Sequence, residues 1–196
     1  MNLPNKLTVS RFVLTVAFLV VIFSEFAYHQ TLALVLFVIA SLTDMFDGII
    51  ARRHQLITSF GILMDPLADK ILTCSAFIAF VGEQRMAAWM VTIVVARELA
   101  ITGLRLLAAN KQVVLAAEGY GKHKTITQIV AIISVLVLTS YPEWGIPGDL
   151  IFGFHVFGKP WVVWFTQIAI WLAVLLTFIS GWLYLWRNRG IYLRDM

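Results

Sequence analysis

Six apolar runs, separated by short polar segments, dominate the hydrophobic pattern of this chain. A helix that crosses a bilayer needs about 20 mostly apolar residues. The pattern predicts helices over residues 7–28, 31–53, 61–81, 86–109, 121–140 and 161–186. We therefore expect an all-α membrane protein, a bundle of six transmembrane helices that forms a single domain over residues 1–196.

The segments outside these runs are short. Residues 142–160 are rich in Gly and Pro, which predicts an outer loop with an interfacial turn. The opening segment NLPNKLTVSR, residues 2–11, is compatible with a short amphipathic helix on the cytoplasmic surface.

Composition and charge agree with a membrane location. The chain is 60% hydrophobic and only 13% charged, about half the charged fraction of a soluble domain. The net charge is +4, but the basic residues are spread between the apolar runs, so we expect no nucleic-acid partner. They concentrate in alternate connections and at both ends, which predicts cytoplasmic N- and C-termini. The single cysteine, Cys74, rules out a disulfide framework within the chain.

Four aspartates interrupt the apolar pattern where the second and third predicted helices meet: Asp44, Asp47, Asp65 and Asp69. At 1.5 Å per residue they lie about 6–12 Å inside the cytoplasmic ends of these helices. Their i,i+3 and i,i+4 spacings keep each pair on one helix face. Two antiparallel neighbours would thus hold all four carboxylates at one level, just beneath the cytoplasmic interface.

Such a cluster needs charge compensation, because burying even one ionised group costs several kcal/mol. The nearby bases Arg52, Arg53 and Lys70 are too few. We expect two divalent cations, Mg²⁺ or Mn²⁺, since hard oxygen ligands suit these ions. A pair of such ions is a known device for phosphoryl-type displacement. Gly48 and Ala51 would leave space for a ligand beside the metals, although small residues also let membrane helices pack closely.

Residues 44–69 have the form D-x2-D-G-x2-A-R-x8-G-x3-D-x3-D, which resembles the signature of the CDP-alcohol phosphatidyltransferases. The opening PNKLTVSR, residues 4–11, is similar to a second, weaker motif of that family. The resemblance implies a six-helix membrane bundle, usually a homodimer, with a dimetal site open to the cytoplasm.

The resemblance also implies a role for each matching position. Asp44, Asp47 and Asp65 would bind the two metals, and Asp69 would contact them as well as act as the general base for the acceptor hydroxyl. The residues that would bind CDP-diacylglycerol are Asn5, Thr8, Gly48, Ala51, Arg52, Thr58 and Gly61. For Asn5, helix capping is the alternative.

Basic residues in the later helices predict a phosphate on the acceptor. The candidates are Arg97, Arg105, Lys122 and Lys124, because a deep arginine needs an anionic partner and a helix N-terminus favours anions. ARELAITGLR, residues 96–105, followed by GKHKT, resembles the bacterial branch of the family that uses sn-glycerol 3-phosphate. The implied reaction gives phosphatidylglycerol phosphate and CMP on the cytoplasmic side of the plasma membrane. The run 161–186 contributes no specific motif.

Several alternatives stay open. Arg97 could pair with an acid from another helix, since the adjacent Glu98 is expected to point elsewhere on the helix surface. Arg105, Lys122 and Lys124 could simply be inside-positive charges. A related transferase could use inositol phosphate, serine or another alcohol. A proton or ion carrier is a different class, because intramembrane aspartates also mark transport paths.

Overall fold

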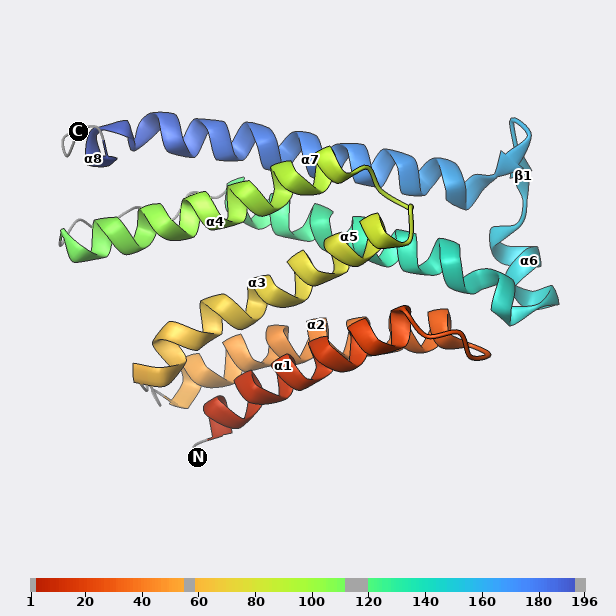
Figure 1. Cartoon of the computed structure of the whole chain (residues 1–196), viewed down its shortest axis with the longest axis horizontal. Coiled ribbons are helices and arrows are strands. Elements are labelled where there is room, and N and C mark those ends of the chain that lie inside the picture. Colours follow the sequence, from red (N-terminus) through yellow and green to blue (C-terminus); the bar gives the residue numbers. More distant parts are fainter. Residues whose placement is uncertain (1–2, 55–58, 112–119, 193–196) are drawn as a thin grey trace.

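Six long helices make up most of the chain that the structure describes. The computed structural model describes the backbone of residues 3–54, 59–111 and 120–192, and the side chains in these ranges except at 3–8, 44–54, 59–69, 110, 120–123 and 192. The long helices, shown in Figure 1, are α1 (Leu3–Ile22), α2 (His29–His54), α3 (Ser59–Gly82), α4 (Ala88–Asn110), α5 (Tyr120–Ser140) and α7 (Trp161–Arg187). The all-α prediction is confirmed.

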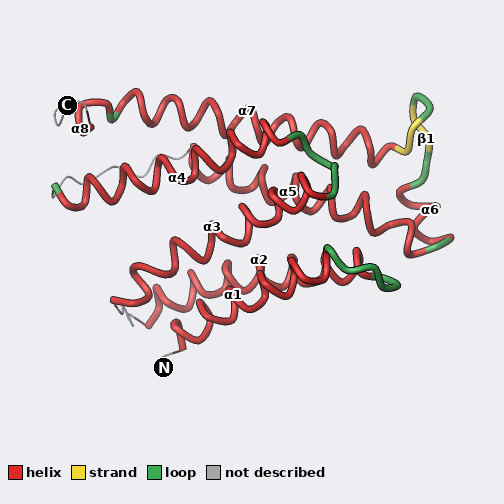
Figure 2. The backbone as a smooth tube through the Cα atoms, viewed as in Figure 1, coloured by secondary structure: helices red, strands yellow, loops and turns green. Residues whose placement is uncertain are grey.

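The helices run back and forth along one long axis. The two termini, the end of α2, the start of α3 and the end of α4 lie at one end of the bundle (Figure 1). The tube in Figure 2 shows the α1–α2 and α3–α4 connections toward the other end. The chain between α5 and α7 also lies there. We call the first the termini end and the second the loop end.

The observed helix bounds agree with the hydrophobic pattern except at the N-terminus. α1 is one continuous helix from Leu3 to Ile22, so a separate amphipathic helix in the opening segment and a first helix that reaches residue 28 are both wrong. Ser24 Oγ donates to Val20 O at 2.6 Å, and Tyr28 takes a positive φ of 65°. Both features favour a turn over another helical turn.

The segment between α5 and α7 is folded rather than a plain loop. It contains a 3-10 helix, η1 (Tyr141–Trp144), the short helix α6 (Ile146–Phe152) and a hairpin of β1 (His155–Val156) and β2 (Lys159–Pro160). Phe157 and Gly158 have φ values of 50° and 79°, as a two-residue hairpin turn with matching twist requires. A last short helix, α8 (Arg189–Tyr192), follows α7.

Large apolar side chains from α1, α2, α3, α4, α5 and α7 fill the interior. Between α1 and α2, the ring centroids of Phe18 and Phe37 are 5.9 Å apart. Between α5 and α7, Ala131, Ala169 and Ala173 form a buried cluster, whose small side chains let the two helices approach closely. Polar contacts join the same pair of helices, since Thr166 Oγ1 donates to Ser134 O at 3.1 Å.

The exterior is apolar as well, which a water-soluble protein would avoid. α7 exposes Trp, Phe, Leu and Ile along its length, and α1 exposes Val13, Val16 and Val20 by more than 60% each. Within the described residues, 124–144 and 161–187 are long and apolar enough to cross a membrane. Shorter apolar helical segments cover 9–22, 29–43 and 70–82.

A carboxylate from η1 caps α2 at the loop end. Glu143 Oε1 accepts from the backbone N–H of Gln30 at 3.1 Å, and Oε2 accepts from the N–H and hydroxyl of Thr31 at 2.8 and 2.5 Å. Trp144 Nε1 also donates to Thr31 Oγ1 at 2.9 Å. These N–H groups lie in the first turn of α2, where no intrahelical acceptor exists and negative charge is favoured.

We predict that Glu143→Gln lowers the apparent melting temperature of the detergent-solubilised protein by several degrees. The amide removes the charge at the helix N-terminus and one of the acceptors, a loss of about 1–3 kcal/mol. Glu25→Gln is the matched control, because Glu25 is an exposed carboxylate at the same end. Equal melting temperatures for the two variants would contradict the capping role.

Candidate functional site

The four aspartates lie on neighbouring helices at the termini end. Asp44 and Asp47 belong to α2, and Asp65 and Asp69 belong to α3. Counted along the helices, Asp47 and Asp65 are about 10 and 9 Å from the ends that face the α2–α3 connection, and Asp44 and Asp69 are both about 15 Å from them. The backbone therefore places the two pairs at the same level. Their side chains lie outside the described residues.

The predicted nucleotide-side residues occupy the same end of the bundle. Asn5 and Thr8 fall in the first turns of α1, Gly48, Ala51 and Arg52 near the end of α2, and Gly61 at the start of α3. The side chains of these residues are outside the described part, and Thr58 lies outside it altogether. The helices thus bring these backbone positions to the aspartate-bearing end.

A buried ionic cluster lies next to this end, centred on Glu98 of α4. The Glu98 side chain is only 8% exposed, and it contacts a base from each of three helices. Lys124 Nζ of α5 forms a close ion pair with Oε1, Lys70 Nζ of α3 lies 3.8 Å from Oε2, and Arg97 Nη1 of α4 donates to Oε1 at 3.3 Å. Lys70 also donates to Thr102 Oγ1. We call these four charged residues the Glu98 cluster.

The direction of Glu98 corrects the sequence-based expectation. Glu98 was expected to point away from Arg97, yet its carboxylate accepts a hydrogen bond from that guanidinium. Two adjacent side chains do not share a helix face, but a long flexible arginine can reach around to its neighbour. The acid that pairs with Arg97 therefore comes from the same helix.

α7 supplies the other side of the Arg97 environment. Arg97 Nη2 donates to Ser180 Oγ at 3.5 Å, while its Nε is buried and has no hydrogen-bond partner among the described residues. One turn further along α7, Tyr184 Oη accepts a hydrogen bond from Arg105 Nε at 3.5 Å. Gln128 of α5 donates to Thr177 of α7 at 3.0 Å. The last long helix, which carries no motif, therefore contributes directly to this region.

The residues of α7 that line this region form a weak pattern in the sequence. The pattern is hard to recognise because the whole run is apolar. Thr177, Gly181 and Tyr184 are buried, and their spacing of four and then three residues defines one helix face. They are small or polar residues within an otherwise bulky apolar run. Glu98 lies within the ARELAITGLR stretch, but its partners come from helices distant in sequence, so no local pattern reveals them.

The Glu98 cluster carries an excess of positive charge that an anionic ligand would compensate. Among the described side chains it holds three bases and one acid, and Arg105 adds a further positive charge nearby. Lys70 directly follows Asp69, so α3 joins the cluster to the aspartates. Of the four predicted phosphate-binding residues, Arg97 and Lys124 lie in the cluster, Arg105 lies beside Tyr184, and the Lys122 side chain is outside the described part.

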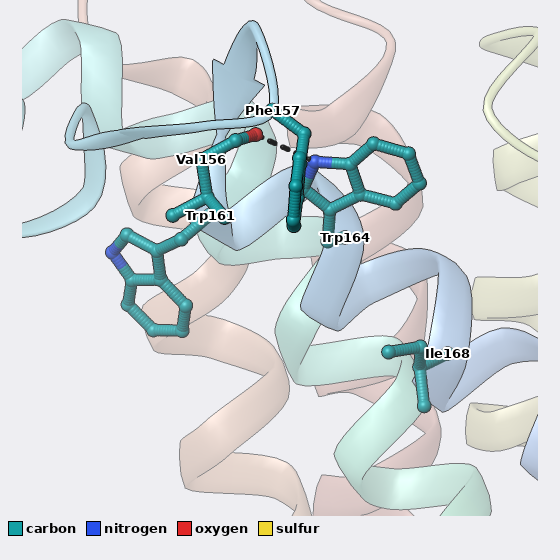
Figure 3. Close-up of a pocket in the computed structure, with 5 residues that line it drawn as sticks. All are labelled: Val156, Phe157, Trp161, Trp164 and Ile168. Atoms are coloured by element: carbon teal, nitrogen blue, oxygen red, sulfur yellow. Dashed lines mark hydrogen bonds between the residues drawn. The ribbon is translucent and has the colours of Figure 1, made fainter.

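A groove at the loop end has no comparable chemistry. It has a volume of about 390 Å³ and is lined by Val156, Phe157, Trp161, Trp164 and Ile168 (Figure 3). Trp164 Nε1 donates to Val156 O at 2.9 Å, so the indole N–H is already satisfied. The lining carries no ionisable group, so this groove offers no chemistry of the kind found around Glu98.

Comparisons with known proteins point to the same helices. The family model for CDP-alcohol phosphatidyltransferase matches residues 1–179. The chain is 38% identical to a CDP-diacylglycerol–glycerol-3-phosphate 3-phosphatidyltransferase of Bacillus subtilis, with 95% of each chain covered. It is 33% identical to the protein of the same name from Rickettsia typhi, over 93% of this chain and 94% of that one. A probable phosphatidylglycerophosphate synthase of Mycobacterium tuberculosis is 39% identical over 67% of this chain and 64% of its own.

The family model covers α1 to α6 and most of α7, including all four aspartates and the Glu98 cluster. Both the signature between Asp44 and Asp69 and the extent of these matches lead to one conclusion: the chain belongs to the CDP-alcohol phosphatidyltransferase family.

Proposed function

We propose that this protein transfers the phosphatidyl group of CDP-diacylglycerol to sn-glycerol 3-phosphate, giving phosphatidylglycerol phosphate and CMP. The observation that carries the proposal is the buried excess of basic side chains around Glu98, beside the aspartate-bearing helix α3. An acceptor without a phosphate, such as serine, leaves most of these bases without a role, whereas a phosphorylated acceptor engages them. The relatives from Bacillus subtilis and Rickettsia typhi are named for this reaction.

We place the six long helices across the bacterial plasma membrane, with the termini end in the cytoplasm. Lys111, Arg187 and Arg189 are at this end, whereas Arg85 and Lys159 are the basic residues at the loop end of the described chain. This distribution supports the orientation, because basic residues accumulate on the cytoplasmic side. The resemblance to the family further suggests a homodimer.

The residues present fit a pair of divalent cations. The donor set is four carboxylates, the hard oxygen ligands that Mg²⁺ and Mn²⁺ prefer. α2 and α3 carry them at matching distances from their connected ends. Asp44, Asp47, Asp65 and Asp69 would hold the ions. When bound, the ions would neutralise charge on the pyrophosphate and on the departing CMP.

The chain's own residues would then orient the two substrates and move one proton. Arg52 and Gly48 bind the donor pyrophosphate, and Arg97, Arg105 and Lys124 hold the acceptor phosphate. Asp69 accepts the proton of the acceptor hydroxyl. The hydroxyl oxygen forms a bond to the phosphorus that carries the diacylglycerol, and the bond from this phosphorus to the oxygen of CMP breaks. CMP leaves with the electron pair of that bond.

The acceptor assay tests the proposal as a whole. With CDP-diacylglycerol and Mg²⁺ or Mn²⁺, we expect glycerol 3-phosphate to support CMP release at least 100-fold faster than serine or glycerol, because only a phosphorylated acceptor engages the bases. Faster CMP release with inositol phosphate than with glycerol 3-phosphate would show that the protein uses a different acceptor. Ion flux into vesicles that lack CDP-lipid, without CMP release, would indicate a carrier.

We predict that Asp69→Asn lowers turnover by about 10²–10⁴-fold, since an amide cannot accept the hydroxyl proton. Binding of CDP-diacylglycerol, measured by its protection against thermal unfolding, should persist. Glu83→Gln, at the loop end, is the control. Turnover equal to that of the unmodified protein would rule out Asp69 as the base.

We also predict that Arg97→Ala raises the KM for glycerol 3-phosphate by about 10–100-fold, the loss expected for a charge-assisted hydrogen bond. The KM for CDP-diacylglycerol should change by less than about twofold. Arg85→Ala is the matched control, because Arg85 is exposed at the loop end. The opposite pattern, with the donor KM raised alone, would place Arg97 on the nucleotide side.

A further inference from the structure

The side chain of Arg97 packs directly against α7 at Gly181, and only a glycine at this position leaves room for it. A Cβ atom added to Gly181 would lie 2.6 Å from Cγ of Arg97, 3.8 Å from its Cδ and 3.6 Å from its Cβ. The first distance is well inside van der Waals contact, and the other two are ordinary contacts. The clash therefore involves the part of the arginine side chain next to the backbone. A movement of the guanidinium end alone cannot relieve it.

The helices on either side leave α7 little freedom to move away. Ile101 and Leu104 of α4 pack against Tyr184 of α7, one turn beyond Gly181. On the α5 side, Ala131 packs with Ala169 and Ala173, and Gln128 donates to Thr177. A displacement of α7 that made room for a methyl group would disturb both contacts. The side chain of Arg97 is the part that can change.

A change at Cγ of Arg97 would move its guanidinium. Side-chain torsions occupy discrete staggered wells, so relief of the clash requires a different rotamer rather than a small adjustment. A new rotamer near the backbone carries the guanidinium several ångströms away from Glu98 Oε1 and Ser180 Oγ, which it now contacts at 3.3 and 3.5 Å. The absent side chain of Gly181 is thus part of what fixes the position of this charge.

We propose that Gly181 is a positioning residue for the acceptor phosphate, acting through Arg97. The proposal rests on the proposed function, in which Arg97 binds that phosphate. Gly181 lies beyond residues 1–179, the part that the family model matches. The role is set by the crossing of α4 and α7 and not by the signature motif.

A double-mutant cycle tests this role, with variants Gly181→Ala, Arg97→Ala and the two combined. We expect Gly181→Ala to raise the KM for glycerol 3-phosphate about tenfold, because the rotamer change disrupts a charge-assisted contact, with the KM for CDP-diacylglycerol within about twofold. In the Arg97→Ala background the same substitution should add less than a twofold change. With alanine at 97, the nearest atom is the Cβ at 3.6 Å, and no clash remains.

Gly103→Ala is the matched control, since an added Cβ at Gly103 of α4 meets nothing within 4 Å. It should leave both KM values within about twofold. If Gly181→Ala does not yield folded protein, the combined variant should still do so, as measured by a monodisperse peak in size-exclusion chromatography.

Three results would overturn the proposal: an unchanged acceptor KM for Gly181→Ala, an equal effect in both backgrounds, or failure of the combined variant to fold. An equal loss in both backgrounds would mean that Gly181 only serves helix packing. If the unmodified protein releases no CMP with glycerol 3-phosphate, the proposed function itself fails, and the two failures are therefore distinguishable.

Discussion

The carboxylate of Glu98 fixes the positions of basic side chains from three helices in the termini half of the bundle. It is buried between helices, and its partners come from α3, α4 and α5. A charge in such a place is tolerated only with close partners of opposite sign. A buried ion pair is nevertheless weak evidence for stability, because apolar residues of similar volume often serve as well. Its value here is positional, since it fixes three bases beside the helix that carries Asp65 and Asp69.

Apolar side chains and charged side chains occupy different halves of the bundle interior. Toward the loop end, apolar side chains such as Phe18, Phe37 and Phe80 fill the core, and Glu143 caps α2 from a distant segment. Toward the termini end, the interior becomes polar, with the Glu98 cluster and the Gln128–Thr177 contact. One half thus contains mainly apolar packing, while the other contains the ionised groups of the candidate site.

Much of this architecture follows from local sequence. Hydrophobic run length gives the long helices, and the aspartate spacing within α2 and α3 gives two pairs at one level, because both depend only on helix geometry. The end of α1 at Ile22 does not follow from the hydrophobic pattern, because apolar residues recur up to Ala27 whereas the backbone already turns and reaches a positive φ at Tyr28. The hairpin before α7 depends on a positive φ at Phe157, a conformation that a phenylalanine in the sequence does not predict.

The site was predictable only in part, for a related reason. Motifs identify residues that are close in sequence, such as Asp44 and Asp47. The roles of Glu98 and Gly181 depend on which helices cross, and at what distance, so a single sequence contains only weak signs of them. The sequence position of Arg97 predicts a buried charge, and its side chain is largely buried. Its partner Glu98 does not follow from the sequence, because the direction of a long side chain depends on the surrounding helices.

A structure of the protein with Mn²⁺, CDP-diacylglycerol and glycerol 3-phosphate would locate the ions and both substrates together, because Mn²⁺ is identified by its anomalous scattering. We expect metal density among Asp44, Asp47, Asp65 and Asp69, with the acceptor phosphate within hydrogen-bonding distance of the Arg97 guanidinium. An acceptor phosphate bound away from Arg97 and Lys124, or aspartates without metal while both substrates are present, would contradict the proposed site.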